Sequence, residues 1–148
     1  MFEMYHTCLV VERVEAAMED LGALHPGGWA KLQEAEILMN RQGSVETANA
    51  RFSYSMGEGP HLELVERVPG TVWDVEPGSL HHTGYWVSDL GEAAGHLEAR
   101  GWVCEVSGGA TDRPIFTYHV SPAGARVELV SRVIQPAFTR WIEGGEYQ

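Results

Sequence analysis

The hydrophobic and polar positions of the chain follow the same order twice. Each repeat begins with a short apolar run, CLVV at 8–11 and GYWV at 84–87, followed by a polar break and then by Ala and Leu at helical spacing. The pattern predicts helices over 14–21 and 90–99, each ended by glycine. Strand-like runs come next, at 35–40, 48–56 and 61–68 in the first repeat and at 102–107, 115–120 and 126–133 in the second.

Direct similarity between the two halves supports this division. The segment HTCLVVERVEAAMEDL from His6 aligns with HTGYWVSDLGEAAGHL from His82, and LELVERV from Leu62 aligns with VELVSRV from Val127. We therefore expect an α+β fold in which two tandem β-α-β-β-β modules form a curved mixed sheet around a shared site. The expected boundaries within this single domain are 1–68 for the first module, 69–80 for a linker rich in Pro and Gly, 81–134 for the second module and 135–148 for a C-terminal tail.

Composition places the chain among globular proteins and narrows its partners. Hydrophobic residues make up 44% and charged residues 21%, and no apolar run approaches the roughly 18 residues of a membrane span. The N-terminal sequence lacks the features of a signal peptide, so we expect a cytoplasmic protein that does not bind membranes. The net charge of -11 and the single lysine, Lys31, argue against nucleic acid as a partner. We expect Cys8 and Cys104 to be free thiols.

The repeat contains four side chains that are suited to binding a divalent metal ion. His6 and His82 start the first strand of each module, and Glu63 and Glu128 occupy equivalent places in the last strand. If the modules pack about a pseudo-twofold axis, equivalent inward positions face one another, and two imidazoles with two carboxylates make an octahedral ligand set with two open positions. A glutamate flanked by Leu and Val is costly to bury without a counter-charge or a metal ion. The alternative is that both strands expose their glutamates to solvent.

Other histidines are weaker candidates for the site. His81 precedes His82 and so points to the opposite face of a strand, either as a packing residue or as a neighbour of the ligands. His61 shares the strand face of Glu63 and is expected to line the pocket, whereas His119 fits either face of its strand.

The segments YHTCLVV, HLELVE, LHHTGYWVSDL and SPAGARVELV resemble those of the vicinal oxygen chelate superfamily, which includes glyoxalase I, methylmalonyl-CoA epimerase, extradiol dioxygenases and bleomycin-resistance proteins. The resemblance covers about residues 4–131 and is closest to glyoxalase I-like and epimerase-like members. The superfamily's ligand order is matched in this chain by His6, Glu63, His82 and Glu128. The HH doublet at 81 and 82 resembles the epimerases. One departure is Ser121, which stands where the superfamily commonly has Asp in the turn before the last ligand.

The resemblance implies a metal-dependent isomerase, epimerase or lyase. Such an enzyme chelates two neighbouring oxygens of a small metabolite and moves a proton through an enolate-like intermediate. Glu128 or Glu63 would leave the metal to carry the proton, with Glu34 or Glu36 as an alternative, separate base. Zn, Ni, Co, Mn and Fe all suit two His and two Glu, so the identity of the metal stays open. Family members often form homodimers, which we expect here, with the site within one chain or across the dimer.

The acidic balance of the chain argues against a coenzyme A substrate. We expect an apolar or aromatic metabolite, bound by Trp86, Tyr54, Tyr118 and His61. Two other functions stay open. An iron(II) extradiol-type dioxygenase needs two His and one carboxylate, so Glu63 distinguishes it from the first hypothesis. A binding protein that sequesters a drug or another small molecule without turnover would need no metal.

Overall fold

The structure of the chain is a computed structural model. It describes residues 1–110 and 112–147; residue 111 of the expected second module and residue 148 of the expected tail lie outside the described residues. Within these ranges the elements are β1 (Glu3–Val11), α1 (Val14–Leu21), the 3-10 helix η1 (Gly22–Leu24), β2 (Gln33–Arg41), β3 (Ser44–Tyr54), β4 (His61–Glu66), β5 (Leu80–Val87), α2 (Leu90–Glu98), β6 (Val103–Ala110), β7 (Arg113–Val120), β8 (Arg126–Ser131), the 3-10 helix η2 (Arg132–Ile134) and α3 (Gln135–Ile142).

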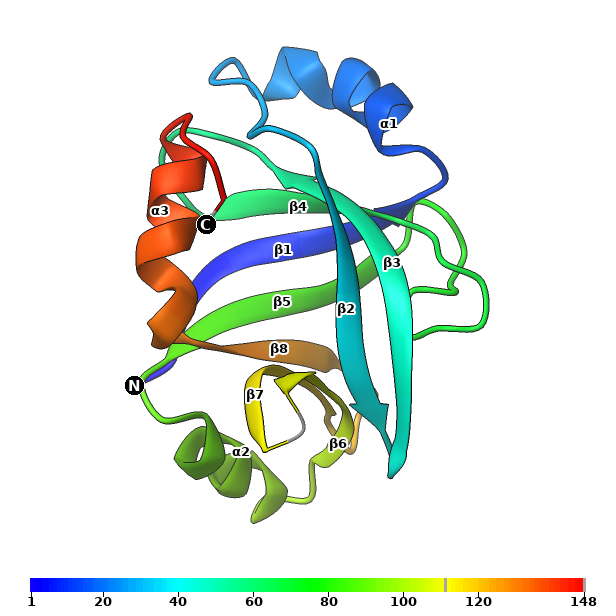
Figure 1. Cartoon of the computed structure of the whole chain (residues 1–148), viewed down its shortest axis with the longest axis vertical. Coiled ribbons are helices and arrows are strands. Elements are labelled where there is room, and N and C mark those ends of the chain that lie inside the picture. The colour runs from blue at the N-terminus through cyan, green and yellow to red at the C-terminus, as the bar shows by residue number, and fades with distance from the viewer. Residues whose placement is uncertain (111, 148) are drawn as a thin grey trace.

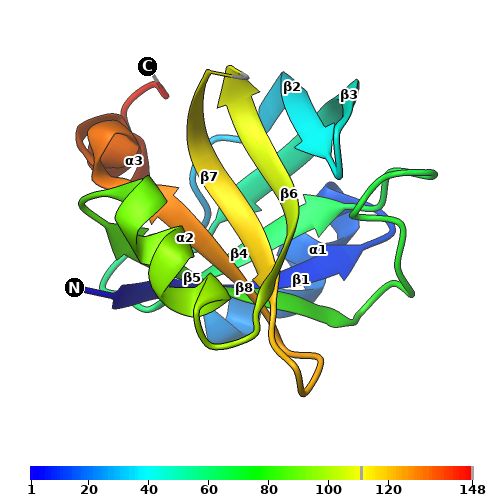
Figure 2. The ribbon, with the colours of Figure 1, turned by 90° about the horizontal axis from the view of Figure 1, so that it is seen from below.

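The strands form one closed, curved barrel in the order β1-β4-β3-β2-β6-β7-β8-β5 (Figure 1, Figure 2). β1 pairs in parallel with β4 and β5 pairs in parallel with β8, whereas the other neighbours are antiparallel. The predicted α+β class and curved mixed sheet are confirmed. The barrel closes where the hairpin of β2 and β3 meets the hairpin of β6 and β7. There β2 and β6 pair Met39 with Gly108 and Asn40 with Ser107.

Alternating side chains along the strands separate the barrel interior from its outer face. In β7, Phe116 and Tyr118 belong to the interior core. Thr117 and His119 point the other way and are buried under α2, whose Glu98 carboxylate lies 2.8 Å from Nε2 of His119. α1 contacts β3 and β4, and α2 contacts β7 and β8, so both helices cover the outside of the barrel (Figure 1).

The register of the central strands brings the two halves of the sequence together. β1 and β5 are antiparallel neighbours, and each has a parallel partner on its other side, β4 beside β1 and β8 beside β5. The paired residues are His6 with Gly84, Cys8 with His82, Cys8 with Glu63 and Gly84 with Glu128. All of these positions lie near the middle of the barrel wall.

The C-terminal helix α3 covers one end of the barrel (Figure 1). Its Phe138 and Trp141 are buried in the same core as Tyr5 of β1. The indole N–H of Trp141 donates to the carbonyl of Lys31 at 2.9 Å, and the Lys31 ammonium forms an ion pair with Glu146 at 2.9 Å. The tail therefore docks on the barrel of its own chain.

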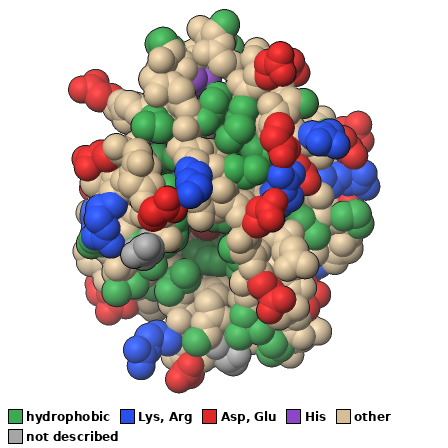
Figure 3. Space-filling view, turned by 45° about the horizontal axis from the view of Figure 1, so that its top comes forward, with side chains coloured by type: hydrophobic (Ala, Val, Ile, Leu, Met, Phe, Trp, Pro, Cys, Tyr) green, Lys and Arg blue, Asp and Glu red, His purple; other side chains and the backbone are tan. Residues whose placement is uncertain are grey.

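Charged side chains are dispersed over one face of the molecule. On the face in Figure 3, acidic and basic side chains are spread around a hollow near the centre, where hydrophobic side chains gather.

Cys8 and Cys104 are free thiols, as predicted. No helix within residues 1–110 and 112–147 is long and apolar enough to cross a membrane.

Candidate metal centre

Four side chains from four different strands meet in the middle of the barrel. They are His6 of β1, Glu63 of β4, His82 of β5 and Glu128 of β8, and each is at most 9% exposed. The two Nε2 atoms are 3.0 Å apart. Nε2 of His6 lies 3.2 Å from Oε1 of both glutamates, and Nε2 of His82 lies 3.4 Å from Oε1 of Glu63 and 3.2 Å from Oε1 of Glu128. The structure thus brings together the four residues that the repeat indicated.

The strand register explains why the two imidazole rings can approach so closely. His6 stands opposite Gly84 across the β1 and β5 pair, and a Cβ atom at position 84 would overlap the His6 ring. The His6 ring also packs edge-on against Tyr5 and Tyr54, with ring centres 4.4 and 5.2 Å away. Glycine at position 84 is therefore a geometric requirement for His6 to reach the cluster.

Electrostatic attraction holds the four groups together when no metal ion is bound. Burial lowers the pKa of the His6 imidazole, but short contacts with the carboxylates of Glu128 and Glu63 outweigh it and raise the pKa to about 9. Burial raises the pKa of both carboxyl groups, but contacts with His6 and His82 outweigh it and hold both pKa values below their usual range. The metal-free site thus keeps two carboxylates and a proton on His6 near neutral pH.

The spacing of the four ligand atoms also fits a divalent metal ion. Zinc bonds to nitrogen and oxygen are about 2.1 Å long, which separates neighbouring ligand atoms by about 3.0 Å in octahedral and about 3.4 Å in tetrahedral geometry. The measured separations between His and Glu ligand atoms and between the two Nε2 atoms are 3.0–3.4 Å. Oε1 of Glu63 is buried among these atoms, yet it has no hydrogen-bond partner in the described part of the chain. These separations are those expected of ligand atoms around one divalent ion.

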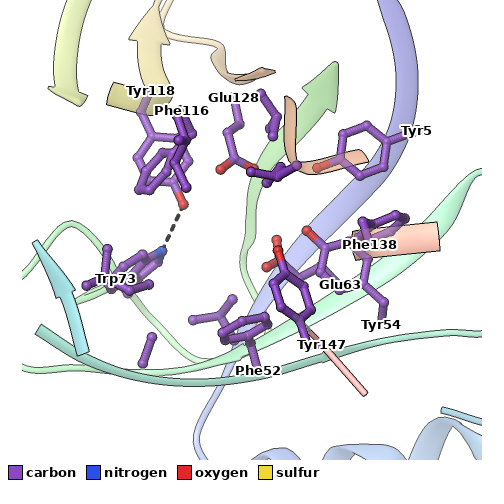
Figure 4. A pocket seen from close by; sticks show the side chains of 16 residues that line it. Tyr5, Phe52, Tyr54, Glu63, Trp73, Phe116, Tyr118, Glu128, Phe138 and Tyr147 are labelled. Carbon is purple, nitrogen blue, oxygen red and sulfur yellow. Dashed lines mark hydrogen bonds between the residues drawn. The ribbon is translucent and has the colours of Figure 1, made fainter. Parts of the chain in front are cut away.

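An apolar cavity of about 120 Å³ lies against the cluster. Figure 4 shows the carboxylates of Glu63 and Glu128 directed into it from two sides. They are the only charged side chains among the described residues that line it, so no Lys or Arg is available there to bind an anion. Much of the wall is aromatic and consists of Tyr5, Phe52, Tyr54, Trp73, Phe116, Tyr118, Phe138 and Tyr147.

The structure separates the predicted substrate-binding residues into two groups. Tyr54 and Tyr118 line the cavity. Trp86 stands behind the cavity wall, because its ring stacks on Tyr5 with ring centres 4.0 Å apart. His61 is half-buried outside the cavity lining, and its Nδ1 lies 2.9 Å from the carbonyl oxygen of residue 55.

The two carboxylates considered as separate bases lie outside the barrel. Glu34 and Glu36 are exposed on β2, and Glu34 forms an ion pair with Arg51 at 2.9 Å. Ile37, which points to the other face of the strand, lines the cavity instead. Neither carboxylate therefore reaches the cavity in this structure.

Parts of the cavity wall were not predicted from the sequence. Trp73 comes from the expected linker, and its indole N–H donates to the Tyr118 hydroxyl at 3.1 Å (Figure 4). Phe138 and Tyr147 come from the expected tail. The one available signal was the presence of large aromatic side chains in the predicted linker and tail, since such side chains seldom stay exposed.

The sequence model of the Glyoxalase/Bleomycin resistance protein/Dioxygenase superfamily matches residues 5–117. The chain belongs to this superfamily. The resemblance found in the sequence is thereby confirmed at the level of the family, and no curated protein matches the chain closely enough to add to it.

Solved structures of other proteins are similar to the chain. Methylmalonyl-CoA epimerase from Mycobacterium tuberculosis is similar with a TM-score of 0.56 at 16% sequence identity, over 87% of this chain and 87% of that chain. A candidate dioxygenase from Bacillus subtilis subsp. subtilis str. 168 is matched with a TM-score of 0.40 at 19% identity, over 86% of this chain but only 40% of that chain. The likeness to the epimerase is a likeness of fold.

Substituting Gly84 tests the geometric requirement at the cluster. Gly84→Ala places a Cβ atom where the His6 ring lies, so His6 must move away from the other three residues. We expect affinity for Co²⁺ to fall by more than about tenfold, the lower end of the effect of groups that orient ligands. Isothermal titration calorimetry measures this Co²⁺ affinity. Gly95→Ala in α2, where an added Cβ meets nothing within 4 Å, is the matched control and should bind like the unsubstituted protein.

The raised pKa of His6 gives the metal-free protein a defined pH dependence. The folded-state pKa of about 9 exceeds the value of 6.5 expected for the unfolded chain. The stabilising contribution is therefore complete below about pH 6.5 and is lost as the pH rises toward 9. Urea unfolding should show a decreasing free energy of unfolding over this range, and His6→Gln should flatten the decrease. A free energy that is constant or rises from pH 6.5 to 9 would contradict the ion-paired cluster.

Proposed function

We propose that this chain is a divalent-metal-dependent enzyme of the glyoxalase or epimerase type. Its substrate is a small, uncharged, apolar or aromatic molecule with two neighbouring oxygens, and the reaction moves a proton next to one of them. The observation that carries the proposal is the convergence of four buried ligand atoms on one wall of an aromatic cavity.

The ion, which is Zn, Ni, Co, Mn or Fe, would be held by His6, Glu63, His82 and Glu128. Two imidazole nitrogens and two carboxylate oxygens suit all of these metals. With these four residues as its protein ligands, the ion would still have room to bind a substrate that offers two oxygens. When bound, the ion supplies Lewis acidity, which makes a proton on the carbon beside a coordinated oxygen easier to remove.

The proton is carried by a carboxylate of the cluster. Glu63 and Glu128 are the only charged groups on the cavity wall in the described residues, and both face the space where a substrate would lie (Figure 4). Glu34 and Glu36 are on the outer face of β2. One of the two cluster glutamates therefore removes the proton from one carbon and returns it to the same or the adjacent carbon.

The size and charge of the cavity limit the substrate. A cavity of about 150 Å³ holds a benzene molecule, so the 120 Å³ here limits the enclosed part of a substrate to about one six-membered ring at most. Because its wall contains no Lys or Arg among the described residues, a carboxylate or phosphate that did not bind the metal ion would be buried without a partner. The bulk of a coenzyme A ester would have to remain outside.

The tail covers part of the cavity. Phe138 of α3 and Tyr147 form part of its wall, and the ring of Tyr147 packs on Trp141 with ring centres 5.0 Å apart. A substrate that fills this covered space displaces water from it, which strengthens the interaction between the carboxylates and a reacting proton.

The proposed cytoplasmic location and homodimer accompany this function as separate predictions, which fractionation and light scattering would test.

The dioxygenase alternative is weaker, because Glu63 converges with the other three residues. Iron dioxygenases use two His and one carboxylate, which leaves three positions for the substrate and dioxygen. A sequestering protein would have no need of four buried ligand atoms. Rapid oxygen consumption with catechol by the iron-loaded protein, unchanged in Glu63→Gln, would instead favour the dioxygenase.

Metal analysis of the purified protein tests the foundation of the proposal. We expect about one equivalent of a divalent metal per chain, and a large loss in His82→Ala, because that variant lacks one of four ligands. His119→Ala removes a buried histidine outside the cluster and is the matched control. Equal metal content in the His82→Ala variant and the unsubstituted protein would refute the site.

Deuterium exchange then tests the reaction. The probe is 2-hydroxyacetophenone, a small aromatic ketone with two neighbouring oxygens, incubated with metal-loaded protein in deuterium oxide and followed by proton NMR. We expect exchange at the carbon that bears the hydroxyl group, and a large loss of rate in Glu63→Gln or Glu128→Gln, whichever residue carries the proton. If the probe binds but exchanges no faster than with His82→Ala, the proposed reaction is wrong.

Substituting Tyr147 tests the role of the tail in selecting substrates by size. Tyr147→Ala removes one aromatic wall of the cavity, so we expect a larger naphthyl hydroxyketone to gain affinity relative to the phenyl compound. Fluorescence titration of both compounds measures this preference. Tyr85→Ala, at a tyrosine outside the cavity lining, should leave it unchanged. An unchanged preference in Tyr147→Ala would show that the tail does not set the size limit.

A further inference from the structure

A chain of hydrogen bonds connects the cluster to the segment between the two halves. Nε2 of His81 lies 2.8 Å from the carbonyl oxygen of Val72. Nδ1 of His81 lies 2.7 Å from Nδ1 of His82, whose other nitrogen, Nε2, faces the carboxylates of the cluster. His81 is only 3% exposed, so these contacts are made inside the protein.

Only one direction of hydrogen-bond donation gives each of these nitrogen and oxygen atoms a suitable partner while His81 stays neutral. A carbonyl oxygen can only accept, so Nε2 of His81 must carry a proton and donate it to Val72. The other nitrogen of His81 then has a lone pair and accepts the Nδ1–H of His82. The reverse direction would require a positively charged His81, which is costly to bury.

We propose that His81 is a positioning residue, which holds the proton of His82 on Nδ1 and thereby fixes Nε2 of His82 as the metal-binding nitrogen. This inference rests on the metal centre proposed above and adds to it a residue that does not touch the ion. A ligand whose ring orientation and tautomer are set in advance binds metal more tightly, because neither has to change when the ion arrives.

His81 is better placed for this role than for binding a metal itself. Cys8, His81 and His82 lie close enough together to suggest a second metal site. However, the 2.7 Å between the two Nδ1 atoms is a hydrogen-bond distance, and it is shorter than the roughly 3.0 Å that separates neighbouring ligands around a divalent ion. The pair is therefore a donor and an acceptor.

His6 shows that this arrangement is specific to one of the two histidines. Nδ1 of His6 is buried and has no hydrogen-bond partner among the described residues. The ring of His6 is positioned by packing against Gly84, Tyr5 and Tyr54. Hydrogen bonding therefore orients one imidazole of the cluster, and side-chain packing orients the other.

NMR of the metal-free protein tests the direction of donation without any need for activity. Long-range correlation of imidazole protons with ¹⁵N distinguishes the two nitrogens of each ring. We expect a proton on Nδ1 of His82, a proton on Nε2 of His81 and none on Nδ1 of His81. A proton on Nδ1 of His81 would overturn the proposal.

Metal affinity of two variants tests the consequence. His81→Leu removes the acceptor, so we expect the affinity for Co²⁺ to fall by about 10-fold to 100-fold. His81→Asn has a side-chain oxygen that can accept from His82, and we expect it to restore most of the affinity. Retention of full affinity in His81→Leu would overturn the proposal, as would an equal loss in both variants.

A matched control separates positioning from a general loss of stability. His119→Leu removes another fully buried histidine, which contacts Glu98 on the outer face of the barrel, and should keep its Co²⁺ affinity. If His81→Leu does not fold, the asparagine variant and the NMR spectrum still decide the question. Failure of the proposed function looks different: the unsubstituted protein would then bind no Co²⁺, although the protons of His81 and His82 would be where we expect them.

Discussion

The close pairing of β1 with β5 is the constraint on which the rest of the site depends. The Nε2 atoms of two imidazole rings can come within 3.0 Å of each other because a small residue stands opposite each ring, Gly84 opposite His6 and Cys8 opposite His82. The parallel partners β4 and β8 then bring one carboxylate from each side. The cluster occupies the middle of the barrel, and the helices α1 and α2 cover the outside.

Burying two carboxylates would be unfavourable without a compensating positive charge. In the metal-free protein the compensation comes from the proton on His6, whose pKa is raised by those same carboxylates. A bound metal ion would replace that proton. The interior of the barrel therefore holds a positive charge in either state, and the stability of the fold is coupled to the chemistry of the site.

The strand and helix order, together with the cluster, could be predicted because both depend on local patterns that the repeat presents twice. Element ends were less predictable. The turn at Gln42 and Gly43 has positive φ at both residues, so β2 and β3 extend to Arg41 and Ser44, beyond the predicted limits of 40 and 48. The strand predicted over 126–133 ends at Ser131, whose side chain accepts from the backbone of Val133 and starts η2. The contacts of Trp73 and Tyr147 join segments far apart in the sequence, and no local pattern encodes them.

The origin of the cavity wall has a consequence for how such a protein can change over evolution. The four candidate ligands come from the repeated strands, in which a substitution would disturb the cluster. Trp73, Phe138 and Tyr147 come from the segments between and after the repeats, which contribute aromatic rings to the wall but no ligand. Selection can therefore change those segments, and with them the range of molecules that the cavity admits, while the four candidate metal ligands stay the same.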